Sequence, residues 1–242
     1  MEKDKHLFLN RIFKSRGIQF EVRPHGSEDP CLEDCPALVA ANTVIFKPSS
    51  TTPLTAARLV EIFERAGLPP GVLNLLVGSS SEVGEVITHD PRVRAVSFTG
   101  SSENGSQIYS SCAMRGAKAQ CEMGGKNPVV VLEDADLSLA VDGIVSGAFG
   151  STGQRCTATS RAVLQESIAD EVIARMAERV SKWKLGNGLD PDVQMGPLVS
   201  AQQLKTVEDY IHSGNHEGAK LVTGGMPGIR TPEGVFHRAY DF

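Results

Sequence analysis

The sequence predicts an α/β protein in which short strands and helices alternate around parallel sheets. From residue 35 onward, strand-like apolar segments alternate with helix-length segments, and glycine or proline separates them. Strands that are joined by helical crossovers at such short intervals pair in parallel. A new cycle of strand and helix begins after Gly124 and Gly125. The sequence therefore predicts two α/β modules, residues 35–124 and residues 125–242.

The first module is predicted to begin with a buried strand and a helix. Thr52 followed by Pro53 suits the start of a helix, and Gly67 suits its end. Ser79 and Glu82 have the spacing of a capping box for a second helix. The first helix is expected to bury Leu54, Ala57, Ile62 and Ala66, and a third helix is expected to run through Ile108. The expected strands cover residues 42–47, 72–77, 95–98 and 119–123.

The second module contains a long helix with clear periodicity. Strands are expected at residues 129–132 and 160–164, and helices at residues 137–149 and 168–185. In the last helix apolar residues recur at three- and four-residue steps, which is typical of one buried face: Ile168, Val172, Met176, Val180 and Trp183. Residues 1–34 show no clear periodic pattern and form an unmatched N-terminal segment.

The composition favours a soluble globular protein, since 40% of the 242 residues are apolar and 22% are charged. The net charge of -5 argues against a nucleic-acid partner, which needs a basic face. No apolar run approaches the ~18 residues of a membrane span, so no membrane partner is expected. The first residues lack a secretory pattern, and Glu2 and Asp4 oppose a mitochondrial presequence. Five cysteines, an odd number, favour reduced thiols and a cytoplasmic protein, and Cys31 and Cys35 are interpreted as unligated thiols rather than zinc ligands.

Two segments that follow predicted strands could hold a cofactor. Lys47 ends a strand, where side chains of a parallel sheet face the ligand crevice, and its ammonium could pair with a phosphate or a ribose. The segment Phe98-Thr99-Gly100-Ser101 lies at a strand-to-helix junction, where glycine permits close approach and the helix amino end suits a pyrophosphate. A solvated lysine and an ordinary tight turn are the alternatives, because the second segment is neither a GxGxxG fingerprint nor a P-loop.

Two further residues could perform chemistry, and each has a structural alternative. Glu122 precedes two glycines at a strand end, where its carboxylate could act as a general base or simply lie at the surface. Cys156 lies beside Arg155 in a loop, where its thiol could be an activated nucleophile or an inert side chain. His212 and His216 are four residues apart on a predicted helix, but they lack a third ligand, so no metal site is predicted.

Together, these segments resemble the aldehyde dehydrogenase superfamily in their order and spacing. The matching text comprises PALVAANTVIFKPSS, AGLPPGVLNLLVG, VSFTGSSENG, EMGGKNPVVVLEDADL, GAFGSTGQRCTATSR and MGPLVS. The resemblance covers residues 35–225, with a fainter echo at 234–242, and its phrasing is most similar to the 2-oxoglutarate semialdehyde (2,5-dioxopentanoate) dehydrogenase branch. It implies part of a parallel-sheet cofactor domain followed by part of an α/β catalytic domain.

The resemblance also implies roles for individual residues. Cys156 would be the nucleophile that attacks a small aldehyde, and its main-chain N–H would donate to the alkoxide. Glu122 would activate the water that releases the acid. NAD or NADP would be the cofactor, held by Lys47, Ser50, Gly100, Ser101 and Gly105. Members that favour NAD often carry glutamate where Ser50 stands, and this makes NADP a plausible cofactor.

Some features of the family have no match in these 242 residues. The family's second oxyanion donor is an asparagine in a Trp-Asn or Phe-Asn motif, which is expected upstream of Cys35 but is not found in residues 1–34. The glutamate of a downstream Glu-Ile-Phe-Gly-Pro segment and the strands that form the family's homo-oligomers are also not found. The first sheet is expected to lack its opening strand, and little turnover is expected from this chain. A truncated, non-catalytic remnant, or a docking partner of an intact homologue, is the alternative to an enzyme.

Overall fold

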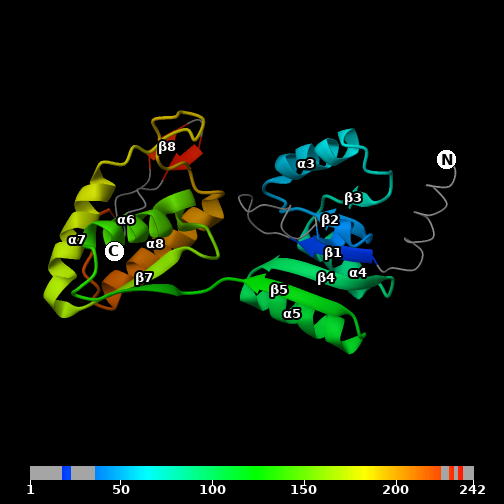
Figure 1. Ribbon diagram of the computed structural model, residues 1–242, viewed down its shortest axis with the longest axis horizontal. Coiled ribbons are helices and arrows are strands. Elements are labelled where there is room, and N and C mark those ends of the chain that lie inside the picture. Colours follow the sequence, from blue (N-terminus) through cyan, green and yellow to red (C-terminus); the bar gives the residue numbers. More distant parts are fainter. Residues whose placement is uncertain (1–17, 23–35, 225–228, 232–233, 237–242) are drawn as a thin grey trace. The chain divides into compact units, whose positions relative to one another are not determined.

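The computed structural model describes residues 18–22, 36–224, 229–231 and 234–236. The chain divides into two compact units between Gly124 and Gly125, and each unit has its own sheet and its own apolar core (Figure 1). The predictions about Cys31, Cys35 and the presequence-like start fall outside the described residues.

The first unit is built on a five-stranded sheet in which all neighbouring strands run parallel. The strands follow the spatial order β3 (Leu73–Leu75), β2 (Thr43–Lys47), β1 (Ile18–Val22), β4 (Val93–Gly100) and β5 (Lys118–Met123). The parallel pairing that the alternation of strands and helices predicts is therefore present.

Strand β1 corrects the expectation that this sheet lacks its opening strand. It lies at the centre of the sheet, between β2 and β4. Its sequence, IQFEV, alternates apolar and polar residues, which is the period of a β-strand. Five residues form too short a run to stand out against a segment that otherwise lacks periodicity.

Helices cover both faces of the first sheet. Val44 and Phe46 of β2 pack in a cluster with Ala56 of helix α3 (Pro53–Arg65). Ile45, which lies between them, joins a second cluster with Ile87 of α4 (Glu85–His89) and Cys112 of α5 (Ser102–Met114). Since successive strand residues point to opposite faces, α3 covers one face of the sheet, and α4 and α5 cover the other.

The predicted buried face of helix α3 is wrong. Leu54 and Ile62 are 70% and 59% exposed, whereas Ala56 is buried and a neighbouring stripe packs against it, comprising Leu59, Val60 and Phe63. Both sets of residues repeat at helical spacing, so periodicity alone does not decide which set faces the sheet.

The expected helix ends are largely correct. The Ser79 side chain accepts a hydrogen bond from the N–H of Glu82 at 3.1 Å and donates to its carboxylate at 2.8 Å. Ser79 thereby caps a π-helical turn, η1 (Ser80–Gly84), which leads into α4, and the Glu82 carboxylate binds the Ser79 hydroxyl. Thr52 is the N-cap residue of α3 but makes no side-chain capping hydrogen bond. Gly67 follows the end of α3 with a φ of 91°, as its role at the helix end requires.

The second unit packs helices around a parallel pair of strands, β6 (Asn127–Val131) and β7 (Thr159–Leu164). Helices α6 (Leu137–Phe149) and α7 (Glu166–Ser181) supply much of its core. The predicted stripe of α7 is confirmed, because Ile168, Val172, Met176 and Val180 are buried and Trp183 packs against them. The helix ends at Ser181, before the predicted residue 185. Leu185 instead forms an isolated parallel β-bridge with Met195.

The remaining elements of this unit are a helix, a short 3-10 turn and a small hairpin. Helix α8 covers Ala201–His216, the 3-10 turn η2 covers Gly150–Gly153, and strands β8 (Ile229–Thr231) and β9 (Gly234–Phe236) pair antiparallel. The helices of the described residues are each too short or too polar to cross a membrane.

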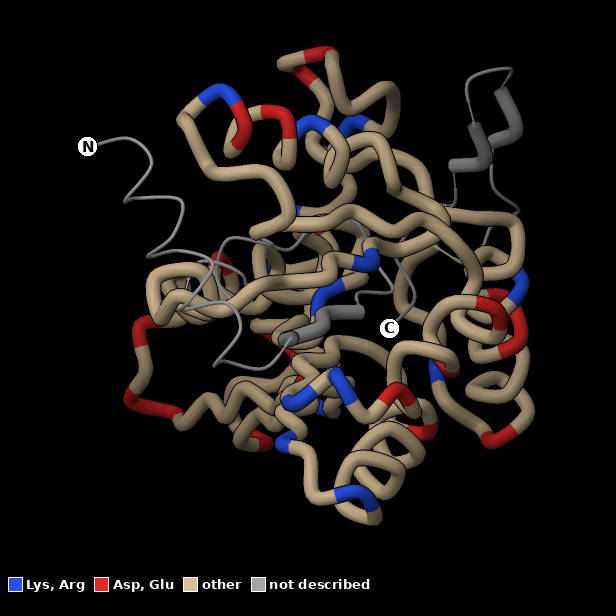
Figure 2. Tube along the Cα trace, turned by 90° about the vertical axis from the view of Figure 1, so that its right-hand side faces the viewer, with Lys and Arg blue, Asp and Glu red and all other residues tan. Residues whose placement is uncertain are grey.

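Acidic and basic residues are interspersed along the chain, as Figure 2 shows. Several of them form local ion pairs on exposed helix faces: Arg58 with Glu61, Glu171 with Arg175, Glu178 with Lys182, and Lys205 with Asp209. Pairs of this kind contribute little to stability, so these charges mainly keep the outer helix faces hydrated.

Candidate active site

Three strands of the first sheet end at one edge and bring the expected cofactor and base residues there. Val22 of β1 lies opposite both Lys47 of β2 and Phe98 of β4. Thr99 of β4 lies opposite Glu122 of β5. Because the strands are parallel, Lys47, the turn after β4 and Glu122 lie along the same carboxyl edge, which is where open α/β sheets bind ligands.

Lys47 is buried at this edge. It is only 2% exposed, and its Nζ donates to the carbonyl of Pro48 at 3.2 Å. Burial lowers the pKa of the ammonium, because the charged form is poorly solvated. Ser50 is exposed in the turn that follows, where the hydroxyls of Ser49 and Thr51 lie 2.7 Å apart. A buried cation beside an exposed hydroxyl suits an anionic or hydroxyl-bearing ligand.

Gly100 packs against a buried aromatic ring, and Gly105 packs against a flexible methionine side chain. A Cβ atom on Gly100 would lie 2.9 and 3.0 Å from two ring carbons of Phe98, whose side chain is buried. A Cβ atom on Gly105 would lie 2.9 Å from Cγ of Met123. A larger residue at Gly100 would therefore displace a buried ring, whereas one at Gly105, inside α5, would require Met123, which is 39% exposed, to shift. This packing role is a reason for the glycines that the sequence reasoning did not consider.

Ser101 begins helix α5 at the same edge of the sheet. Its side chain accepts a hydrogen bond from the N–H of Asn104 at 3.3 Å. The amino end of a helix offers N–H groups and a positive dipole to an anion. Gly100 at the end of β4, Ser101 at the N-cap and Gly105 in the first turns of α5 thus form a potential phosphate-binding junction between the strand and the helix.

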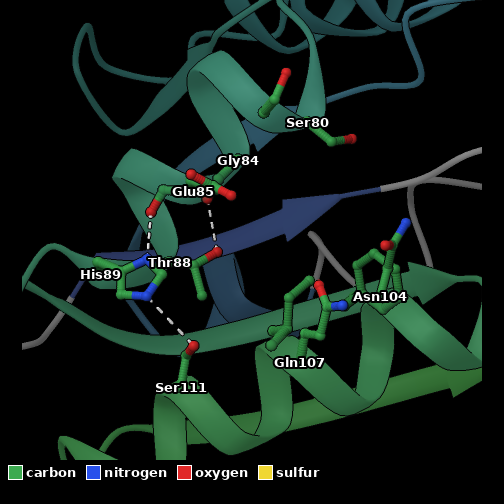
Figure 3. Close-up of a pocket in the computed structure, with 11 residues that line it drawn as sticks. Ser80, Gly84, Glu85, Thr88, His89, Asn104, Gln107 and Ser111 are labelled. Carbon is green, nitrogen blue, oxygen red and sulfur yellow. Dashed lines mark hydrogen bonds between the residues drawn. The ribbon is translucent and has the colours of Figure 1, made fainter.

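A pocket of about 330 Å³ lies between α4 and α5, and the sequence reasoning missed it. Asn104, Gln107 and Ser111 project from α5 toward α4 (Figure 3). On the opposite side His89 binds the carbonyl of Glu85 at 2.8 Å, and its Nε2 lies 3.4 Å from the Ser111 hydroxyl. The three polar residues of α5 follow the glycine turn at three- and four-residue spacing, and this spacing could have located the pocket.

Glu122 is exposed near the end of the edge strand β5. The preceding residue, Cys121, donates from Sγ to the carbonyl of Gly105 at 3.5 Å. Burial raises the pKa of the Cys121 thiol, and the nearby thiol of Cys112 and carboxylate of Glu122 raise it further. An exposed carboxylate at a strand end is accessible to water, as a general base needs to be.

Cys156 lies half-buried in the turn between η2 and β7, in the second unit, and is not part of a disulfide. The residues before it adopt left-handed conformations, with φ values of 52° at Ser151, 58° at Thr152 and 68° at Gly153. Arg155 donates from Nε to the hydroxyl of Ser151 at 3.0 Å. The guanidinium that the sequence reasoning considered as an activating cation is therefore engaged in the preceding 3-10 turn.

Asn127, the first residue of β6, contacts the Cys156 turn and was not singled out from the sequence. Its side-chain amide donates to the carbonyl of Cys156 at 2.7 Å and to that of Ala158 at 3.2 Å. Its neighbour Lys126 places Nζ 5.6 Å from the ring centroid of Tyr210 on α8. The candidate residues thus fall in both units: Lys47, Ser50, Gly100, Ser101, Gly105 and Glu122 in the first, and Cys156 and Asn127 in the second.

His212 and His216 both lie on α8. In the part of the chain that the structure describes, no group of three or more histidine, cysteine, aspartate or glutamate side chains could hold a metal ion. The two histidines therefore lie on one helix without a ligand set around them in the described residues.

Comparison with known proteins gives a family match over most of the chain. Residues 30–240 match the model of the aldehyde dehydrogenase family. The chain is 46% identical over 226 residues to alpha-ketoglutaric semialdehyde dehydrogenase of Bacillus subtilis (strain 168), a match that covers 93% of this chain and 46% of the relative. It is 47% identical over 203 residues to 2,5-dioxopentanoate dehydrogenase of Saccharolobus solfataricus, covering 82% and 42%.

The fold is similar to that of a solved structure of betaine aldehyde dehydrogenase from Staphylococcus aureus in complex with NAD+. The TM-score is 0.86 at 38% sequence identity, and the match covers 92% of this chain and 45% of that one. The predicted fold class and the resemblance noted in the sequence are thereby confirmed. The chain spans about half the length of the curated relatives that it matches.

Proposed function

Because this chain belongs to the aldehyde dehydrogenase family, we propose that it takes part in the NAD(P)-dependent oxidation of an aldehyde to a carboxylic acid, with Cys156 as the nucleophile. The observation that carries the proposal is the position of this thiol. It lies half-buried in a turn, within the GQRC segment that resembles the family's nucleophile motif. Members of the family are NAD(P)-dependent oxidoreductases, and a member with a similar fold has been solved with NAD+.

The first unit supplies groups that fit such a cofactor. The pocket between α4 and α5 has the size and the polar side chains for part of a nucleotide. The junction of β4 and α5, with Gly100, Ser101 and Gly105, suits the pyrophosphate, and Lys47 and Ser50 suit a ribose or its phosphate. When bound, the cofactor accepts the hydride that the aldehyde carbon must lose.

Cys156 and Glu122 would carry the covalent steps. The thiolate of Cys156 forms a bond to the carbonyl carbon, and the carbonyl oxygen becomes an alkoxide. The main-chain N–H of Cys156 donates to that alkoxide, and a single such donor contributes roughly 3 kcal/mol in comparable sites. Loss of the C–H bond as hydride leaves a thioester on the sulfur. Glu122 takes a proton from water, whose oxygen then displaces the sulfur, and this releases the acid and restores the thiolate.

The substrate is proposed to be a small aldehyde such as 2,5-dioxopentanoate. This choice rests on two relatives that are named for that compound and its synonym and are 46% and 47% identical to this chain. NADP is proposed as a cofactor beside NAD, because Ser50 places a hydroxyl where a glutamate would repel a 2′-phosphate. A cytoplasmic location stays a prediction.

Selective alkylation of the thiols tests the proposal. Brief treatment with limiting iodoacetamide at pH 7, followed by mass spectrometry, should label Cys156 ahead of Cys112 and Cys121. Burial raises the pKa of the Cys112 and Cys121 thiols, so little of either is thiolate at pH 7. Raising the pH should narrow the difference in labelling between Cys156 and the other two described cysteines, because Cys112 and Cys121 then ionise.

Cys156→Ser and Cys112→Ser are the matched controls. The first should abolish the fast label and the second should leave it unchanged. Preferential labelling of another cysteine, or equal labelling of Cys156, Cys112 and Cys121 at pH 7, would refute the assignment of Cys156. Such a result would favour a non-catalytic member of the family.

A further inference from the structure

The backbone that leads to Cys156 adopts a conformation that needs external contacts to persist. Ser151 and Thr152 are not glycines, yet both have φ values in the left-handed region, 52° and 58°. Such residues cost free energy and are held in place by the surrounding structure. One contact is made by Gln154, whose Oε1 accepts a hydrogen bond from the N–H of Val199 at 3.4 Å. This contact lies before Cys156, and on the other side of the thiol the turn is contacted by Asn127.

The side-chain amide of Asn127 donates two hydrogen bonds to the turn that follows Cys156. The distances are 2.7 Å to the carbonyl of Cys156 and 3.2 Å to the carbonyl of Ala158. Thr157 and the N–H and Cα of Ala158 lie between these two carbonyls along the chain. An amide that bridges them fixes the direction of the peptide after Cys156 and the path into β7.

The main chain of Asn127 is itself held in place by a hydrogen bond. The main-chain carbonyl of Asn127 accepts a hydrogen bond from the hydroxyl of Ser160 at 3.4 Å. The register between β6 and β7 shifts at this point, between Asn127 and Pro128. Proline has no N–H to donate to the ladder, so the side chain of Asn127 supplies hydrogen bonds where the backbone of the next residue cannot.

We propose that Asn127 is a positioning residue for Cys156: its side-chain amide holds the turn that carries the thiol by donating to the carbonyls of Cys156 and Ala158. The inference rests on the proposed function, in which Cys156 is the nucleophile. It adds a residue that acts on the orientation of the thiol and of the main-chain N–H without touching the substrate. Asparagine suits this geometry because its short side chain carries an amide with two N–H donors. Aspartate has the same shape but would direct oxygens at both carbonyls.

The experiment compares Asn127→Ala and Asn127→Asp with a matched control, Asn74→Ala. Asn74 also donates from its side-chain amide to two carbonyls, those of Val44 at 3.2 Å and Gly71 at 3.0 Å, but it lies in the first unit. For each variant of the full chain, the rate of Cys156 alkylation by iodoacetamide is measured from pH 6 to pH 9. Thermal unfolding and hydrogen exchange of residues 155–158 are measured in parallel.

The expected result is specific to the Asn127 variants. Both should alkylate Cys156 at least roughly fivefold more slowly, with a changed pH profile and faster exchange at residues 155–158, because two hydrogen bonds to the turn are lost. Asn74→Ala should lower thermal stability while the rate and profile stay within about twofold of the wild type. A residue with a merely structural role would lower thermal stability without altering the pH profile.

The outcomes separate this inference from the proposed function. If Cys156 reacts selectively in the wild type and keeps its rate and pH profile in Asn127→Asp, the positioning role is wrong while the proposed function stands. If Cys156 reacts no faster than Cys112 and Cys121 in the wild type, the positioning role and the proposed function are both wrong. Should Asn127→Ala fail to fold, the isosteric aspartate variant decides the question.

Discussion

Replacing Gly100 with alanine should destabilise the first unit by overpacking, even without a cofactor present. The new methyl group would lie 2.9 and 3.0 Å from two ring carbons of Phe98, and closer still to a third. Carbon atoms pack best at about 3.5–4.0 Å, so the ring or the turn must move by more than half an ångström. Phe98 is buried in a cluster with Ile87, Val93 and Val96 and has little space to yield. Overpacking of this kind costs about 1–3 kcal/mol.

Urea unfolding followed by circular dichroism would measure this cost, and a double-mutant cycle would assign its cause. In a Phe98→Leu background the methyl group meets a smaller side chain, so Gly100→Ala should cost clearly less than it does in the wild type. NAD(P) affinity, measured by calorimetry, should stay weakened in the double variant if the turn must approach the pyrophosphate closely. Strictly additive destabilisation by the two substitutions would refute the packing argument.

Three further predictions concern separate parts of the chain. Ser50→Glu should shift the ratio of NADP to NAD affinity toward NAD, because a carboxylate repels a 2′-phosphate; an unchanged ratio in calorimetry would exclude this role. Hydrogen bonding from Arg92 holds the pKa of the Asp90 carboxyl at about 2, against an ordinary 3.8. Arg92→Ala should therefore raise the pKa of Asp90 in an NMR titration. The lowered pKa stabilises the folded state above pH 3.8, and this stabilisation is lost as the pH falls through about 2. The variant should lack this pH-dependent stabilisation. Ile144→Ala should destabilise the second unit by about 2–5 kcal/mol, since Ile144 is 1% exposed, whereas Leu139→Ala on the same helix, 73% exposed, should change unfolding by less than about 0.5 kcal/mol.

Elements with strong local signals were predictable from the sequence. Helix α6 covers Leu137–Phe149, which are the predicted residues. At its start the Asp136 carboxylate accepts hydrogen bonds from the N–H groups of Ser138 and Leu139, and Gly150 follows its end. The stripe of α7 was predictable because its four buried residues repeat without a competing set. On α3, by contrast, two apolar stripes compete, and only the packing against β2 and β3 selects the one with Ala56.

Strand β1 shows the limit of pattern reading in a short segment. Its five residues alternate in polarity, but its place at the centre of the sheet follows from pairing with β2 and β4. These partners lie far along the chain, and pairing with them depends on tertiary context that a window of five residues does not contain.

The candidate residues of the first unit and those of the second differ in predictability for a related physical reason. At the carboxyl edge of the first sheet, each candidate residue stands at or just after the end of its own strand. Parallel pairing then aligns those ends, so a list of strand ends already places Lys47, the turn after β4 and Glu122 on one edge. The contact of Asn127 with the Cys156 carbonyl spans 29 residues and joins a side chain to a main-chain oxygen. No residue type is needed at the acceptor, since every residue has a carbonyl, so the sequence carries no complementary signal. The strand ends could therefore be found by reading the chain, whereas the contact of Asn127 with the Cys156 turn follows only from the folded structure.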